Sequence, residues 1–166
     1  MRYCVIDFET TGLDPVRDQV VEFAAVRVEE GEIGLHITAL CKPSISIPPG
    51  ATRVHGITDR MVRFADPFSA YLTTLLDFIG ADTLVGHNLS FDFGFLRTAC
   101  AHAGLTFDPP RLCTLQMARK LFPQLPSKAL AHVAAHLNIK NSTYHRALGD
   151  AMTTARILLR MLEGGS

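Results

Sequence analysis

Two acidic residues follow an apolar run near the start of the chain, in the segment CVIDFE over residues 4–9. Side chains of a β-strand alternate between two faces, so the carboxylates of Asp7 and Glu9 are expected on the same side. Strands are depleted in Asp, and an unpaired buried carboxylate costs several kcal/mol. A divalent cation would remove that cost, so the pattern favours a metal site over a purely structural role.

Two further acids are expected in the first turns of helices. Asp92 ends the segment HNLSFD, and Asp150 ends the segment HRALGD. Each alone has an ordinary explanation, because an Asp in the first turn offsets the helix dipole by up to about 1 kcal/mol. Their order along the chain favours a metal site over this explanation. D-x-E lies in a strand, Asp92 begins a helix after a second strand, and H-x4-D begins the final helix. Together the four acids predict one metal site.

The ligand types indicate which metal and which chemistry. Carboxylates without a Cys-His cluster favour Mg²⁺ or Mn²⁺ over structural zinc, and two divalent ions would neutralise four carboxylates. Paired ions can clamp the attacking and leaving oxygens of a phosphoryl displacement, which predicts phosphodiester hydrolysis. His145 is the candidate general base, because imidazole has a reference pKa of about 6.5. It does not share a helical face with Asp150, so we expect it in the loop before the helix.

Apolar periodicity supplies the elements that must position these residues. Strands are expected at 3–8, 19–28 and 33–41, joined as an antiparallel meander, then at 83–86 and near Leu112. Segments 43–50 and 104–111 contain Pro and Gly and are expected to be loops. The pattern predicts a three-layer α/β arrangement with mixed strand order. Helices are expected near 72–79, 91–103, 114–121, 128–137 and 147–162.

Length and composition set broad limits. The chain has 166 residues, 48% of them hydrophobic, and we expect a single domain over 1–166. The formal net charge is zero, although residues 1–83 hold 7 Lys and Arg against 12 Asp and Glu. The four cysteines show no C-x-x-C spacing, which favours a reducing, cytoplasmic setting. No signal-peptide core or membrane-spanning run is visible, so secretion and membrane insertion are not expected.

Four segments together resemble a known family. DFETTG at 7–12, VHGIT at 54–58, HNLSFD at 87–92 and HRALGDA at 145–151 look like the motifs of the DEDDh, or DnaQ-like, 3′-to-5′ exonucleases. The resemblance covers nearly the whole chain. It implies a ribonuclease H-like three-layer α/β fold with a central mixed five-stranded sheet flanked by helices. The branch that the chain resembles is the proofreading one, typified by the epsilon subunit of bacterial DNA polymerase III.

The resemblance also implies roles for individual residues. His145 would activate the nucleophilic water, and His55 and Ile57 would approach the terminal bases, although Ile57 fits the core equally well. Asn88 would lie near the phosphate. The terminal nucleotide would be held by backbone amides of Thr10, Thr11 and Gly12. The implied metal ligands are Asp7, Glu9, Asp92 and Asp150.

The aromatic residues of the 91–103 helix need a separate interpretation. Phe91, Phe95 and Leu96 have the spacing of a buried helix face, which leaves only Phe93 as a candidate for base stacking. The bases themselves would belong to the 3′ end of a single nucleic acid strand.

The main hypothesis is a metal-dependent exonuclease that releases nucleoside monophosphates from single-stranded or frayed 3′ ends, with DNA favoured. RNA 3′-end trimming is the enzyme alternative, and a nuclease-like binding module or polymerase accessory subunit is the non-catalytic one. The chain ends soon after its last expected helix, at 163–166, so no long tail is expected to recruit a polymerase. Proofreading or repair, with a DNA polymerase as a possible partner, remain open roles.

Overall fold

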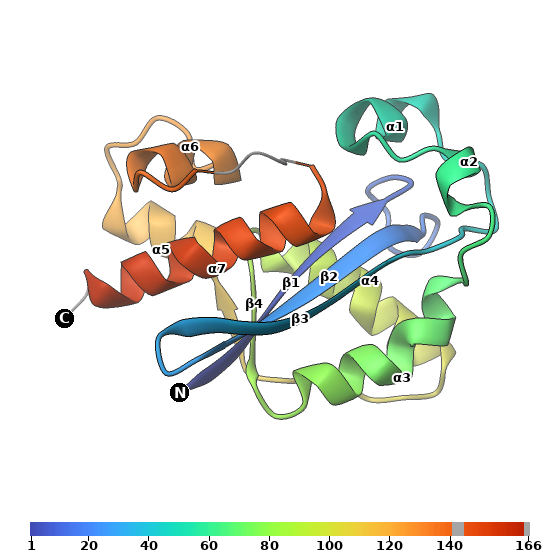
Figure 1. Ribbon diagram of the computed structural model, residues 1–166, viewed down its shortest axis with the longest axis horizontal. Coiled ribbons are helices and arrows are strands. Elements are labelled where there is room, and N and C mark those ends of the chain that lie inside the picture. Colours follow the sequence, from blue (N-terminus) through green and yellow to red (C-terminus); the bar gives the residue numbers. More distant parts are fainter. Residues whose placement is uncertain (141–144, 165–166) are drawn as a thin grey trace.

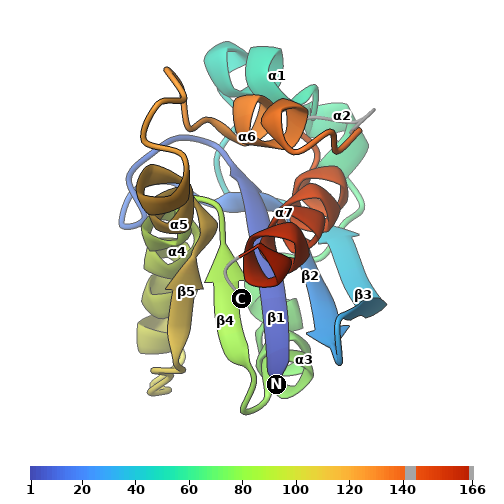
Figure 2. The ribbon, with the colours of Figure 1, turned by 90° about the vertical axis from the view of Figure 1, so that its left-hand side faces the viewer.

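The computed structural model describes residues 1–140 and 145–164, so the last two residues of the expected C-terminal end lie outside it. A five-stranded sheet runs through the molecule in the order β3-β2-β1-β4-β5 (Figures 1 and 2). The predicted mixed sheet is therefore present. The strands are β1 (Arg2–Thr10), β2 (Val20–Glu29), β3 (Glu32–Leu40), β4 (Thr83–Gly86) and β5 (Arg111–Cys113).

The two halves of the sheet differ in direction. β1, β2 and β3 form the predicted antiparallel meander, with β1 in the centre of the sheet. β4 and β5 run parallel to β1 and to each other, since helices provide their connections. The pairing of β1 with β4 ends at Val5 opposite Val85, although β1 continues to Thr10. The last residues of β1 therefore extend beyond the end of β4.

Helices cover both faces of the sheet. α3 and α4 lie on one face and α7 crosses the other, while α5 and α6 pack beside α7 (Figure 2). The described helices are α1 (Pro49–His55), α2 (Asp59–Val62), α3 (Phe68–Ile79), α4 (Leu89–His102), α5 (Thr114–Leu121), α6 (Leu130–His136) and α7 (Ala147–Glu163).

The alternation of β1 decides which side chains meet which helices. Cys4, Ile6 and Phe8 enter the core beneath α3 and α4. Tyr3 and Val5 pack on the other face, against α7. Because the period is two, Asp7 and Glu9 continue the α7 side at the carboxyl end of the strand.

Two short helices differ from the sequence prediction. Segment 43–50 was expected to be entirely loop, yet Pro49 and Gly50 begin α1. A proline needs no amide partner in the first helical turn, so here it starts a helix instead of preventing one. α2 was also missed, because four residues are too few to show an apolar period. Among the described residues, no helix is long and apolar enough to cross a membrane.

Candidate active site

The acidic site lies where β1 extends past β4. The Phe8 amide, which has no β4 partner there, donates to Asp92 Oδ1 at 2.8 Å. The Asp92 carboxylate thus accepts the hydrogen bond that a paired strand would otherwise accept. This bond holds Asp92 beside Asp7 and Glu9. Ligand sites in open α/β sheets form at such carboxyl ends, where neighbouring strands diverge.

The fourth acid comes from α7. Asp7, Glu9 and Asp150 each offer a carboxylate oxygen within 4.8 Å of the others. Asp150 Oδ2 also accepts a hydrogen bond from the His145 amide at 3.0 Å. The structure therefore brings together the four acids that the sequence singled out.

The electrostatics fit a divalent cation. Burial raises the pKa of Glu9 to about 8, and repulsion from Asp150 and Glu22 adds to the shift. Burial raises the pKa of Asp92 to about 7, although its hydrogen bond from Phe8 acts in the opposite direction. The pKa of Asp7 is raised well above its usual value by burial and by repulsion from Asp92 and Asp150. A divalent cation at this place would favour the ionised carboxylates.

His145 lies two residues before α7, as predicted, and not on the helix. It is exposed and adopts a left-handed backbone conformation with φ of 61°. This conformation is uncommon for a non-glycine residue, and it occurs often at functional sites. The amide bond to Asp150 fixes the His145 backbone against the acidic cluster.

Sequence reasoning missed an ion pair beside this cluster. Glu22 of β2 lies opposite Glu9 in the β1–β2 ladder and is 5% exposed. Arg146 donates to it from Nε and from Nη2, the latter at 2.7 Å, and the Ala147 amide donates at 2.9 Å. The pair therefore attaches the first turn of α7 to the sheet. An acid within the apolar run VVEFAAV at 20–26 was the available signal.

The turn after β1 is closed by its own side chains. Thr10 Oγ1 donates to the Gly12 carbonyl, and Thr11 Oγ1 donates to Asp18 Oδ1 at 3.1 Å. The Thr11 amide donates to the Gln19 carbonyl at 2.9 Å. The Thr11 amide is therefore hydrogen-bonded within the protein. The predicted bond from this amide to a nucleotide would require the turn to open.

His55 and Ile57 are buried. The Ile57 amide donates to His55 Nδ1 at 3.0 Å, so the ring proton belongs on Nε2 and is directed to the Thr10 carbonyl at 3.2 Å. Burial lowers the pKa of His55, in agreement with a neutral ring. Ile57 is 0% exposed and packs with Val21 and Val62. Of the two roles left open for Ile57, the structure shows the core role, and the base contacts stay a prediction.

Asn88 and His87 stand at the start of α4. Asn88 is exposed, has φ of 72° and accepts a weak hydrogen bond from Ser90. His87 contacts the Thr114 hydroxyl at 2.9 Å and the Lys128 carbonyl at 2.7 Å. Asn88 therefore keeps an exposed side chain one turn before Asp92, whereas His87 joins α4 to α5 and the segment before α6.

The structure contradicts the stacking role predicted for Phe93. Its ring is 7% exposed and lies under the guanidinium of Arg111 at 4.4 Å. Phe95 and Leu96 are buried as expected, whereas Phe91 is only half-buried and packs on Phe95. Other elements pack against more than one side of α4. The spacing of its aromatic residues therefore did not show which of their side chains stay exposed.

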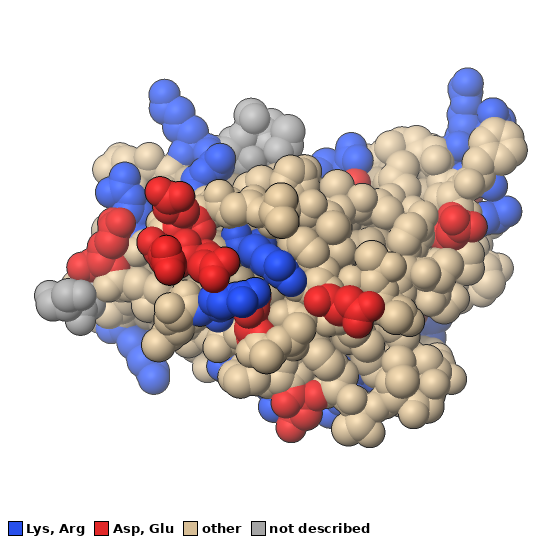
Figure 3. All heavy atoms as spheres, turned by 60° about the horizontal axis from the view of Figure 1, so that its bottom comes forward, with Lys and Arg blue, Asp and Glu red and all other residues tan. Residues whose placement is uncertain are grey.

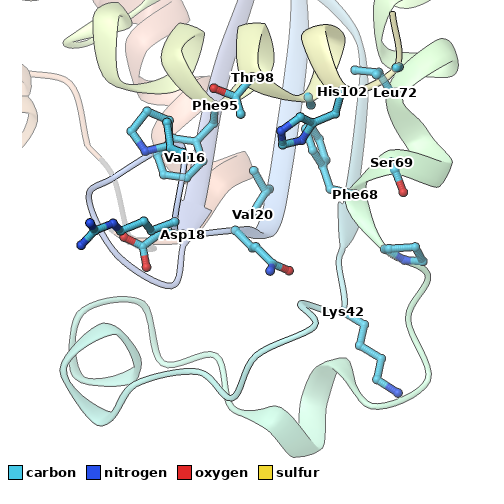
Figure 4. A pocket seen from close by; sticks show the side chains of 16 residues that line it. Val16, Asp18, Val20, Lys42, Phe68, Ser69, Leu72, Phe95, Thr98 and His102 are labelled. Carbon is cyan, nitrogen blue, oxygen red and sulfur yellow. The ribbon is translucent and has the colours of Figure 1, made fainter.

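A pocket of about 360 Å³ lies elsewhere, between the 15–20 loop, α3 and the second half of α4 (Figure 4). Phe68, Phe95 and Leu72 line its apolar part, and Thr98 and His102 face it from α4. None of its lining residues belongs to the acidic cluster. We therefore place the chemistry at the carboxyl end of β1 and not in this pocket.

Comparison with known proteins identifies the family. The family model described as Exonuclease matches residues 4–158. The chain belongs to the exonuclease family. The exonuclease domain is 36% identical over 162 residues to the DNA polymerase III subunit epsilon of Aquifex aeolicus, covering 97% of the chain and 80% of that protein. It is also 36% identical over 156 residues to the DNA polymerase III PolC-type of Clostridium perfringens, covering 94% of the chain but 11% of that protein.

Solved structures agree on the fold. The exonuclease domain resembles exonuclease X in complex with 5′ overhanging duplex DNA, with 28% identity and a TM-score of 0.77 over 98% of this chain and 92% of that one. Exonuclease I matches with a TM-score of 0.85 and 22% identity, over 98% of this chain and 41% of that one. The predicted ribonuclease H-like fold is confirmed. The prediction of a 3′-to-5′ exonuclease hydrolase is confirmed at the level of the domain.

Proposed function

We propose that the domain removes nucleoside monophosphates one at a time from single-stranded or frayed 3′ ends of DNA. The observation that carries this proposal is the cluster of four carboxylates at the end of β1, with His145 on the segment that leads into α7. Hydrolysis of a phosphodiester requires that the negative charge on the phosphate and on the leaving oxygen be neutralised. A site built from carboxylates can supply this positive charge only through bound cations.

We infer that the cluster holds two divalent cations, Mg²⁺ or Mn²⁺. Oxygen ligands suit both ions, and the raised pKa values of Asp7, Glu9 and Asp92 support a need for added positive charge. When bound, such ions position the phosphate and lower the pKa of a coordinated water. The proposed ligands are Asp7, Glu9, Asp92 and Asp150.

The protein's own residues would do the remaining work. His145 would accept the proton of the attacking water through its imidazole, since the segment is fixed beside Asp150 by the amide hydrogen bond. The exposed Asn88 would lie on the phosphate side. The Gly12 amide is the favoured candidate for holding the terminal nucleotide, because the Thr11 amide is already used.

We infer the substrate and the partner of the domain from its relatives. The relatives include DNA polymerase III subunits, and exonuclease X was solved in complex with duplex DNA. We therefore favour DNA over RNA, a DNA polymerase as the partner, a proofreading or repair role and a cytoplasmic location. The chain spans about a tenth of the length of the PolC-type relatives, so their other activities are not inferred for this domain.

The direct test uses 5′-labelled single-stranded DNA and RNA of matched sequence, with Mg²⁺, Mn²⁺ or a chelator. We expect stepwise shortening from the 3′ end, faster on DNA and absent without metal. Asp7→Asn should lower kcat by about a thousandfold, which corresponds to the several kcal/mol that a metal supplies. Asp77→Asn, on the exposed surface of α3, is the matched control and should keep the parent rate.

Three outcomes would contradict the proposal. A folded Asp7→Asn domain with the parent rate would remove the acidic cluster from the mechanism. Faster shortening of RNA than of DNA would instead assign the domain to RNA 3′-end trimming. If neither strand is shortened in either metal, the domain acts as a binding module.

A further inference from the structure

Three arginines and an aromatic ring form an exposed surface on the short helices beside the site. We call Arg53 of α1, Arg60 of α2, and Arg63 and Phe64 directly after α2 the α1–α2 basic patch. All four side chains are exposed, and Phe64 is 86% exposed. In Figure 3, several basic side chains extend from the right-hand end of the molecule, where α1 and α2 lie, while the opposite end carries both acidic and basic side chains.

The arginines of the patch differ from the arginines of the sheet and of the site that form ion pairs. Arg2, Arg27 and Arg146 each have a carboxylate partner. Within the part of the chain that the structure describes, neither Arg53, Arg60 nor Arg63 forms an ion pair.

Two acids lie in or next to the same segment. The carboxylate of Asp59 accepts the Ile47 amide at 3.0 Å through Oδ1, and Asp66 follows Phe64 by two residues. Three guanidinium groups against these two carboxylates leave a local excess of positive charge on a domain whose net charge is zero. This excess of positive charge suits an anionic partner.

Phe64 adds a second kind of contact. The Arg63 guanidinium covers its ring at 4.4 Å from the centroid, which holds the ring in the basic surface. An exposed aromatic ring among arginines is the combination that single-stranded nucleic acid binds, because bases stack on the ring while the cations meet the phosphates. Val54 and Met61 are also exposed nearby, so the surface is apolar between its charges.

The helices that carry the patch are attached to the strands that carry the active site. His55, which follows Arg53 and Val54 in α1, donates from Nε2 to the carbonyl of Thr10 at the end of β1. Ile57 and Val62 are buried against Val21 of β2 and hold the two helices to the sheet. In Figure 1, α1 and α2 lie near the carboxyl end of β1, so a strand whose 3′ end reached the acidic cluster has these helices close to its path.

We propose that the α1–α2 basic patch binds the single strand upstream of the scissile 3′ nucleotide, with phosphates on its three arginines and a base on Phe64. This inference rests on the proposed exonuclease function. The patch would therefore favour long single strands over very short ones.

The test separates strand binding from catalysis. Anisotropy of labelled single-stranded DNA, measured on a domain that carries Asp7→Asn, reports binding even if the domain proves to have no activity. Replacing Arg53, Arg60 and Arg63 with Ala should weaken binding and make the slope of log affinity against log salt shallower by about 2. Phe64→Ala should weaken binding about tenfold.

The matched control replaces Arg156 and Arg160 with Ala, which removes exposed arginines from α7. The control should change neither affinity nor salt slope. In the active domain, the patch variants should lower the ratio of kcat/KM for a strand of about 20 nucleotides to that for a dinucleotide. The control should leave this ratio at the parent value.

The absence of tryptophan from the chain offers an independent readout. Phe64→Trp introduces a single indole, and stacking of a base should quench its fluorescence as DNA is added. Parent-like affinity and length ratio in the patch variants, or no quenching of the introduced indole by DNA that binds, would overturn the proposal. In that case the surface would be assigned to a protein partner.

Discussion

At the scale of single residues, the site depends on acids that the fold keeps close together without equal numbers of cations. Arg146 is the one basic side chain that pairs with a carboxylate of this region among the described residues. Its partner Glu22 is buried and also raises the pKa values of Asp7 and Glu9. The Glu22–Arg146 pair therefore has both an electrostatic and a positioning effect on the acidic cluster.

The two members of this pair should respond differently to substitution. Arg146→Gln leaves Glu22 as an uncompensated buried carboxylate, so we expect it to lower the free energy of unfolding by about 2 kcal/mol, discounted for the partial exposure of Arg146. Glu22→Gln removes a negative charge from the cluster and should cost less. Urea unfolding of both single variants and the double variant measures the coupling. Equal losses in the two single variants would argue against this account.

At the scale of elements, the turn from β1 to β2 links the acidic site to the proposed substrate side. Asp18 holds this turn by accepting from the Thr11 hydroxyl and from the Asp14 amide at 2.9 Å. A Cβ atom on Gly12 would lie 2.4 Å from the Asp18 carboxylate. The glycine is therefore required by the space that Asp18 occupies.

Gly12→Ala should displace Asp18 and loosen the turn. We expect a loss of about 1 kcal/mol in stability, the net value of a hydrogen bond, and a KM that rises more than kcat falls. Steady-state kinetics on single-stranded DNA measures both. Gly34→Ala on the edge strand β3 is the control, because its new Cβ would meet only the Arg27 carbonyl at 3.8 Å. A fall in kcat without a change in KM would place the role of the turn in catalysis instead.

At the scale of the whole molecule, metal binding and stability should be linked through pH. Asp92 and Glu9 have pKa values raised to about 7 and about 8, chiefly by burial. An acid whose pKa is raised in the folded state keeps its proton there, so stability is greatest below the unfolded value of about 4 and falls as the pH rises through the folded pKa.

We expect the metal-free domain to lose stability steadily between about pH 4 and pH 8. Mn²⁺ or Mg²⁺ should raise Tm, and more at the upper end of this range, because the ionised carboxylates bind the cation. Thermal unfolding with and without chelator at several pH values measures this. The Asp7→Asn variant should show a smaller metal effect; a metal effect of the same size in this variant and in the parent would contradict the ligand assignment.

Much of this molecule was predictable from local patterns. The alternation around Asp7 and Glu9, the helix-opening positions of Asp92 and Asp150, and the apolar periods specified the four acids and the sheet that carries them. These features depend on near neighbours in the chain, which is why the sequence by itself determined which four acids matter and the mixed sheet. The exonuclease family was indicated by the resemblance of the motifs at 7–12, 54–58, 87–92 and 145–151.

Tertiary structure decided the rest, because it depends on contacts between distant segments. Glu22 and Arg146 are 124 residues apart and meet only through the packing of α7 on the sheet. The burial of Phe93 under Arg111 depends on where β5 pairs, and the burial of His55 on how α1 reaches β1. Apolar spacing shows that a face is covered, but only the packed chain shows which segment covers it and which side chains remain open to a substrate.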